Sequence, residues 1–95
     1  MAVFMEMIPV WLSVDDKRLV PDLQEAREKL DSSQGETVLD FSSVRRIDAS
    51  ALRAMEDLVG EADRKGVKVV LCGVSVAVYK VLKLAKLASR FSFTN

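Results

Sequence analysis

The chain has 95 residues, of which 49% are hydrophobic, so it is long enough for one small domain with a buried core. Its 14 basic and 14 acidic residues cancel, which argues against a strongly basic nucleic-acid binder and against an acidic disordered tail. Histidine is absent, so imidazole catalysis and histidine metal ligation are excluded. The single cysteine can form neither an internal disulfide nor a Cys-x-x-Cys zinc site, and this usage is typical of a reducing compartment.

The first apolar stretch covers residues 3–14 and contains Pro9. Because proline cannot donate a ladder hydrogen bond, this stretch predicts an edge strand or two short extended pieces. It has no basic leader and no small-residue cleavage site, and no apolar run of the chain approaches the roughly 20 residues of a membrane helix. We therefore expect a cytoplasmic protein without direct membrane insertion. Met5 and Met7 share one face of the strand, a candidate edge contact in a homodimer.

The first helix is predicted from Pro21, after a turn at residues 15–17. Proline and the following Asp22 suit a helix amino terminus. An apolar stripe then recurs at Leu23, Ala26 and Leu30. Residues 31–35 break this helix, and a short strand is predicted over residues 37–41. The loop after that strand, residues 42–47, has apolar anchors at Val44 and Ile47.

A second helix is predicted after Asp48, because apolar residues share one of its faces: Ala51, Leu52, Ala54, Met55, Leu58, Val59 and Ala62. Gly60 costs this helix about 1 kcal/mol relative to alanine, and either allows close packing or is simply tolerated. Lys65 and Gly66 supply the cation and the glycine typical of a helix carboxyl terminus. Residues 67–72 are nearly all apolar, as expected of a buried parallel strand.

A third helix is predicted after Gly73 and Ser75, which suit a turn and an N-cap. Four cations fall on one side of an ideal helix over this segment: Lys80, Lys83, Lys86 and Arg90. They form either a basic face for an acidic partner or a nucleotide, or a solvated face that balances the acidic residues of the preceding helix. Residues 91–93 alternate like a last short strand. This order of elements predicts one α/β domain over residues 1–95, with a mostly parallel mixed β-sheet and packed helices.

Residues 46–52 are the most informative segment. In open α/β sheets, partners engage the carboxyl ends of strands, where loops lead into helix amino termini. If Asp48 caps the second helix, Ser50 is the second residue of that helix, and its hydroxyl is exposed beside unpaired backbone N–H groups. Those donors and the helix dipole would hold a phosphate on Ser50, while Asp48 would repel it. Plain helix capping also explains Asp48 and Ser50, so both readings stay open at this point.

Residues 38–44 (VLDFSSV) and 47–52 (IDASAL) resemble the core signature of STAS domains, which are the anti-sigma factor antagonists and their relatives. In that signature, a strand ending in Asp-Leu-Ser is followed by a loop and then by Asp-Ser-Ser-Gly-Leu at a helix start. Gly66, the next apolar strand and the turn at residues 73–75 follow in matching order, so the resemblance covers roughly residues 11–93. Ala49 and Ala51 depart from the signature, replacing its first serine and its glycine.

The resemblance implies a bacterial regulatory protein without enzyme activity, which binds a serine kinase that acts as an anti-sigma factor. In antagonist-type members, that kinase phosphorylates the second serine of the motif and phosphorylation abolishes binding, which assigns the phosphoacceptor role to Ser50. Arg45 and Arg46 flank the motif; they would contact the kinase's nucleotide or an acidic groove, or be ordinary loop charges. The predicted partner-binding residues are Arg45, Arg46, Asp48, Ala49, Ser50, Ala51 and Ser75.

Two other functions stay open. A second STAS branch is a small cytoplasmic subunit of bacterial ABC transporters that maintain outer-membrane lipid asymmetry, and residues 73–87 resemble its carboxyl-terminal helix. The third possibility is an interaction or scaffold module without a switch. No cofactor or metal is predicted, because a Gly-rich phosphate loop is missing and the acidic residues of the second helix do not converge like metal ligands. Nor is a nucleic-acid partner expected.

Overall fold

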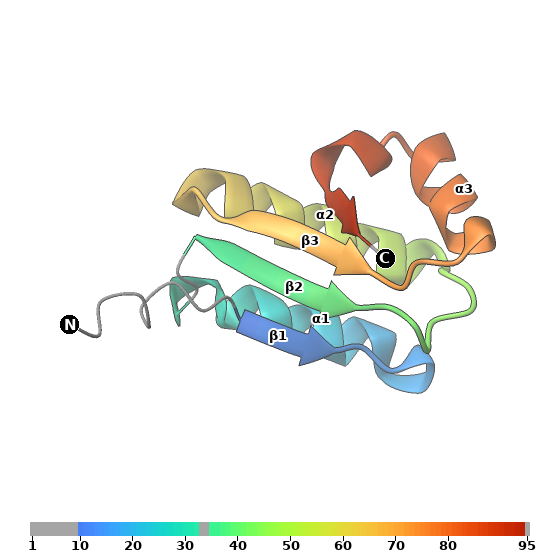
Figure 1. Ribbon diagram of the computed structural model, residues 1–95, viewed down its shortest axis with the longest axis horizontal. Coiled ribbons are helices and arrows are strands. Elements are labelled where there is room, and N and C mark those ends of the chain that lie inside the picture. Colours follow the sequence, from blue (N-terminus) through green and yellow to red (C-terminus); the bar gives the residue numbers. More distant parts are fainter. Residues whose placement is uncertain (1–9, 33–34, 95) are drawn as a thin grey trace.

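The computed structural model describes residues 10–32 and 35–94. Within these residues, strands and α-helices alternate along the chain (Figure 1). The strands are β1 (Val10–Ser13), β2 (Glu36–Asp40), β3 (Lys68–Cys72) and β4 (Ser92–Thr94). The α-helices are α1 (Leu19–Glu28), α2 (Ala49–Lys65) and α3 (Val76–Leu84). Short 3₁₀ helices precede α1 (η2, Asp16–Arg18), follow it (η3, Leu30–Ser32) and precede β4 (η4, Ala88–Arg90).

The described strands form one sheet in the order β1-β2-β3-β4, and all three neighbouring pairs run parallel. In the register, Leu12 lies opposite Leu39, Leu39 opposite Leu71, and Leu71 opposite Phe93. The predicted α/β class with a mostly parallel sheet is therefore confirmed. The expected edge contact of Met5 and Met7 lies outside the described residues.

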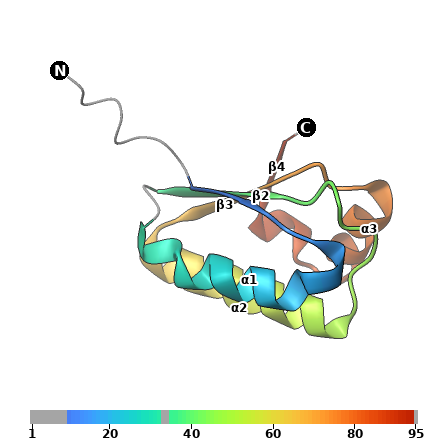
Figure 2. The ribbon, with the colours of Figure 1, turned by 90° about the horizontal axis from the view of Figure 1, so that it is seen from below.

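Helices α1 and α2 lie side by side on one face of the sheet, as both Figure 1 and Figure 2 show. The predicted apolar stripes face inward, because Leu23 and Ala26 of α1 and Met55 and Leu58 of α2 are fully buried. Each helix is thus held by the hydrophobic effect through one face, while its charged residues remain in water.

The two central strands are buried over nearly their whole length, as the continuous apolar run of β3 predicts. Leu39 and Leu71 point into the core beneath the sheet, where α1 and α2 pack. Because side chains alternate along a strand, their neighbours Val38, Val70 and Cys72 form a second, smaller cluster on the opposite face.

The first helix begins earlier than predicted, at Leu19. The turn before it is η2, where the Asp15 carboxylate accepts a hydrogen bond from the backbone N–H of Lys17. Pro21 is consequently the third residue of α1. It still fits there, because the first helical N–H groups have no intrahelical acceptor to lose.

The third helix ends earlier than its sequence pattern indicates. Its last residue is Leu84, and Lys86 has a left-handed φ of 63°, which stops the helix. Lys86 and Arg90 therefore do not continue the helical face of Lys80 and Lys83, which corrects the predicted set of four aligned cations. Arg90 instead pairs with Asp63 of α2 at 2.5 Å, in agreement with the balancing role.

Gly60 does not serve close packing, because a Cβ atom added there would meet nothing within 4 Å.

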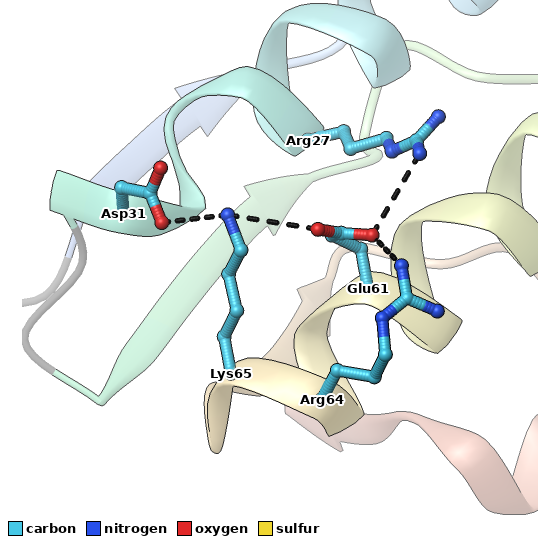
Figure 3. A network of polar contacts seen from close by, with 5 residues as sticks. All are labelled: Arg27, Asp31, Glu61, Arg64 and Lys65. Atoms are coloured by element: carbon cyan, nitrogen blue, oxygen red, sulfur yellow. Dashed lines mark hydrogen bonds and ion pairs between the residues drawn. The ribbon is translucent and has the colours of Figure 1, made fainter.

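Nearby, an ion-pair network joins α1, η3 and α2 (Figure 3). Glu61 contacts Arg27 at 3.7 Å and also pairs with Arg64, while Lys65 bridges Glu61 and Asp31 at 3.6 Å and 2.6 Å. These contacts link α1 and α2 at the end of α2 distant from Asp48.

Candidate functional site

The site is built at the carboxyl end of β2, where the chain turns toward α2. The Asp40 carboxylate accepts hydrogen bonds from the Ser42 hydroxyl at 2.6 Å and from the Ser42 backbone N–H at 2.9 Å. Both bonds favour the charged form, so they lower the pKa of Asp40 below its ordinary value, the hydroxyl bond most. The first residues of the loop are thereby held close to the end of the strand.

The turn after β3 packs against the same loop. Phe41 donates its backbone N–H to the carbonyl oxygen of Cys72 at 2.8 Å, extending the pairing of β2 and β3. Gly73 follows with a left-handed φ of 70°, and a Cβ atom there would lie 2.9 Å from the Cβ of Ser42. Glycine at position 73 therefore allows the turn after β3 to approach Ser42, which follows β2, and any other residue there would force the backbone to shift.

The loop from Ser42 to Asp48 is held in place by two buried side chains and by one backbone hydrogen bond. Val44 and Ile47 are buried in the core, which confirms them as apolar anchors. Between them, the backbone N–H of Arg45 donates to the Asp16 carboxylate of η2 at 3.1 Å. The side chains of Arg45 and Arg46 are exposed. Core burial and the Asp16 bond therefore position the loop, and they leave both guanidinium groups at the surface.

Helix α2 begins as the sequence predicts. The Asp48 carboxylate accepts a hydrogen bond from the backbone N–H of Ala51 at 2.8 Å, which makes it the N-cap. Ser50 is the second helical residue, and it is exposed, as are Asp48 and Ala49. The side chain of Ala51 is only 1% exposed and packs in the core, so it offers no surface to a partner. This burial corrects the inclusion of Ala51 among the predicted contact residues.

Two hollows flank the start of α2 on the side of α1. One of about 380 Å³ lies between η2, the first turn of α1 and the residues Arg46 and Asp48. The other, of about 150 Å³, lies between α1 and α2 and is lined by Ser50, Arg53 and Asp57 among others. Val20 of α1 lines both hollows, so they are neighbours. Both contain charges of each sign, which suits contact with a polar protein surface.

Sequence reasoning missed two cations of these hollows, Lys17 and Arg53. Arg53 could have been found, because it lies three residues after Ser50 on the predicted helix and so faces the same side. Lys17 had no such signal, since its position depends on how η2 packs beside the loop.

Ser75 lies elsewhere. Its hydroxyl accepts a hydrogen bond from the backbone N–H of Val78 at 3.1 Å and caps α3, as the sequence predicts. It lines a separate hollow of about 230 Å³ together with Tyr79 and Phe93. It lines neither hollow beside Ser50, so it is separate from Arg46, Asp48 and Ser50, the predicted residues that line them.

The family model of the STAS domain matches residues 18–95, which include the end of β2, the loop before α2 and the start of α2. The chain belongs to the STAS domain family. Two solved structures are similar to this STAS domain. A proposed anti-sigma factor antagonist from Thermotoga maritima has a TM-score of 0.70 at 17% identity, over 93% of this chain and 75% of that one. A sulfate transporter family protein from Wolinella succinogenes has a TM-score of 0.73 at 18% identity, over 88% and 75%.

At these identities, the two solved structures show that the fold of this STAS domain is shared, and no more. A search of curated proteins found no match. No helix within residues 10–32 and 35–94 is long and apolar enough to cross a bilayer. In this STAS domain, the signature residue Asp40 ends β2 and Ser42 follows in the turn, while Asp48 caps α2 and Ser50 lies in its first turn.

Proposed function

We propose that this STAS domain is an anti-sigma factor antagonist: it binds a serine kinase that acts as an anti-sigma factor, and phosphorylation of Ser50 ends the binding. The observation that carries the proposal is the exposure of Ser50 as the second residue of α2, beside the hollow between α1 and α2. A proposed anti-sigma factor antagonist shares this fold, so the fold is compatible with the role.

The chain acts as substrate and ligand in this proposal, and it supplies no catalytic group. The kinase holds ATP, and the Ser50 hydroxyl oxygen attacks the terminal phosphorus. The bond from that phosphorus to the bridging oxygen of ADP breaks, ADP leaves, and the hydroxyl proton passes to a base of the kinase. An exposed hydroxyl at a helix start meets the one steric requirement of this step, which is access.

Release follows from the charge that the phosphate adds, about −1.5 to −2 at pH 7. The Asp48 carboxylate lies two residues away and already accepts the N–H of Ala51, so it both repels the phosphate and withholds one helix donor from it. Arg53 provides a single cation on the same side. A partner that covers the neutral start of α2 would then have to desolvate a phosphate that is only partly compensated, which opposes binding.

The test uses the tagged protein in its native host. Intact mass of the purified protein is expected to show one added phosphate, and Ser50→Ala is expected to lack it. The co-purifying protein is expected to be a serine kinase with wild type and Ser50→Ala, and to be lost with Ser50→Asp. Ser89→Asp is the matched control, because Ser89 is exposed in η4, away from the hollows beside Ser50.

Three results would contradict the proposal. The first is an unmodified Ser50 under all growth conditions tested. The second is undiminished kinase binding by Ser50→Asp. The third is recovery of an ATPase and a permease in place of a kinase, which would assign the chain to the lipid-transport branch.

A further inference from the structure

The charges of the chain are segregated along its length although their sum is zero. All 14 acidic residues lie at or before Asp63, and seven of the 14 basic residues follow it. The last third of the chain, which forms β3, α3, η4 and β4, therefore contains no acidic side chain. Such asymmetry is typical of a surface that meets an anionic partner.

The outer side of α3 combines these cations with exposed apolar residues. Val78 and Leu82 are fully buried and attach the helix to the core. On the opposite side, Val76 is 71% exposed and Leu84 is 85% exposed. With Lys80 and Lys83, which are also exposed, they form what we call the α3 face: Val76, Lys80, Lys83 and Leu84.

The cations of this region lack the compensation seen elsewhere. No ion pair involves Lys80, Lys83 or Lys86 within residues 10–32 and 35–94, whereas Arg90 is paired with Asp63. The spacing of Val76, Lys80 and Leu84 places them in one row about 12 Å long, at 1.5 Å per residue. Apolar side chains therefore alternate with free positive charge along the row.

The composition of the α3 face favours a lipid surface over a protein partner. Protein interfaces bind through aromatic residues and arginine seated in pockets, and they are depleted in lysine. The α3 face has two lysines, two projecting aliphatic side chains and no arginine, and the partly exposed Tyr79 beside it is of a residue type that is also enriched at bilayer interfaces. Lysine and leucine on one exposed helix face are typical of helices that lie at an anionic bilayer, where the apolar groups enter between the headgroups and the ammonium groups meet lipid phosphates.

We propose that the α3 face adsorbs reversibly to anionic lipid bilayers, with Val76 and Leu84 inserted among the headgroups and Lys80 and Lys83 against the lipid phosphates. The residues that line the hollows beside Ser50 come from η2, α1, α2 and the loop before α2, and none comes from α3. Membrane adsorption therefore does not rest on the proposed function, and it leaves the start of α2 accessible.

The test is co-sedimentation of the purified protein with vesicles of phosphatidylcholine containing about one third phosphatidylglycerol, an anionic surface on which lysines add to binding. Binding is expected at low salt and is expected to disappear near 1 M salt, where the Debye length is about 3 Å. Pure phosphatidylcholine vesicles should bind far less protein. One lysine near such a surface contributes roughly fivefold in affinity, so K80E/K83E should bind at least about 25-fold more weakly.

The matched control is K29E/K68E, which changes the net charge equally; Lys29 directly follows α1 and Lys68 begins β3, whereas α3 follows the other end of β3. At about 0.1 M salt, where the Debye length is about 10 Å, this control is expected to bind within about twofold of wild type, because more distant surface charges are largely screened. Leu84→Ser should weaken binding without changing its salt dependence. Circular dichroism establishes that each variant is folded.

The proposal is overturned if wild type does not bind the anionic vesicles at low salt, which would leave this face to an acidic protein partner. It is equally overturned if both vesicle types bind alike, or if K29E/K68E loses as much binding as K80E/K83E at about 0.1 M salt.

Discussion

Replacing Gly73 by alanine is expected to destabilise the fold more than replacing Gly66, although both glycines have nearly the same left-handed φ. The angles are 70° for Gly73 and 69° for Gly66. A left-handed conformation costs an alanine about 1–2 kcal/mol, and the reduced entropy of the unfolded chain returns about 0.4–1 kcal/mol. The backbone conformation alone therefore predicts a loss of about 1 kcal/mol at either position.

The surroundings of the two glycines separate them. A Cβ atom at Gly66 meets nothing within 4 Å, whereas one at Gly73 would lie 2.9 Å from the Cβ of Ser42 and 3.1 Å from its Cα and its backbone nitrogen. Because two of these atoms belong to the backbone, the loop must shift as a unit. Forced overpacking of this kind costs about 1–3 kcal/mol. Gly73→Ala should consequently lose about 2–4 kcal/mol in total.

Urea unfolding followed by far-ultraviolet circular dichroism measures both losses, provided that the two variants have the same m-value. Gly66→Ala serves as the control, because it carries the conformational cost without the contact. Equal losses for the two variants would refute the close approach of Gly73 to Ser42. Wild-type stability of Gly73→Ala would refute the left-handed conformation as well.

Three further changes test other contacts of the site and of α3. Asp48→Ala should lose about 1 kcal/mol of stability with the cap on α2, while Asp48→Asn retains most of it; equal melting temperatures for wild type and Asp48→Ala would contradict the cap. Because hydrogen bonds from Ser42 lower the pKa of Asp40 in the folded state, Asp40 stabilises the fold above its ordinary pKa of 3.8, and this contribution is lost as the pH falls through the folded pKa. Ser42→Ala should raise the pKa of Asp40 in a carboxyl NMR titration and reduce the acid sensitivity of stability; an unmoved titration would be inconsistent with the 2.6 Å bond. Lys86→Gly should gain about 1 kcal/mol in urea unfolding by relieving the left-handed φ of 63°, and no gain would speak against that turn.

Elements defined by local chemistry were predictable. Asp48 starts α2 and Gly66 ends it because capping depends on residues within one turn of the helix end. The buried strand β3 was recognisable from its unbroken apolar run. The candidate site was predictable for the same reason, since Ser50 is the second residue after a capping aspartate.

Elements that depend on packing were not predictable. The apolar and basic periodicity of α3 continues to Lys86 and Arg90, yet the helix ends at Leu84 and Arg90 reaches Asp63 of α2. The burial of Ala51, by contrast, agrees with the apolar face predicted for the second helix, and it was the inclusion of Ala51 among the partner-binding residues that conflicted with that face.

The sequence by itself determined the order of elements, the ends of α2 and the place of Ser50 in it, because helix caps and apolar periodicity act over a few neighbouring residues. Only the tertiary structure decided that Asp16 holds the loop before α2, that Gly73 packs on Ser42, and that Ser50 and Arg53 line one hollow beside α1. These contacts join segments far apart in the chain, and their geometry is set by how the helices and strands pack together.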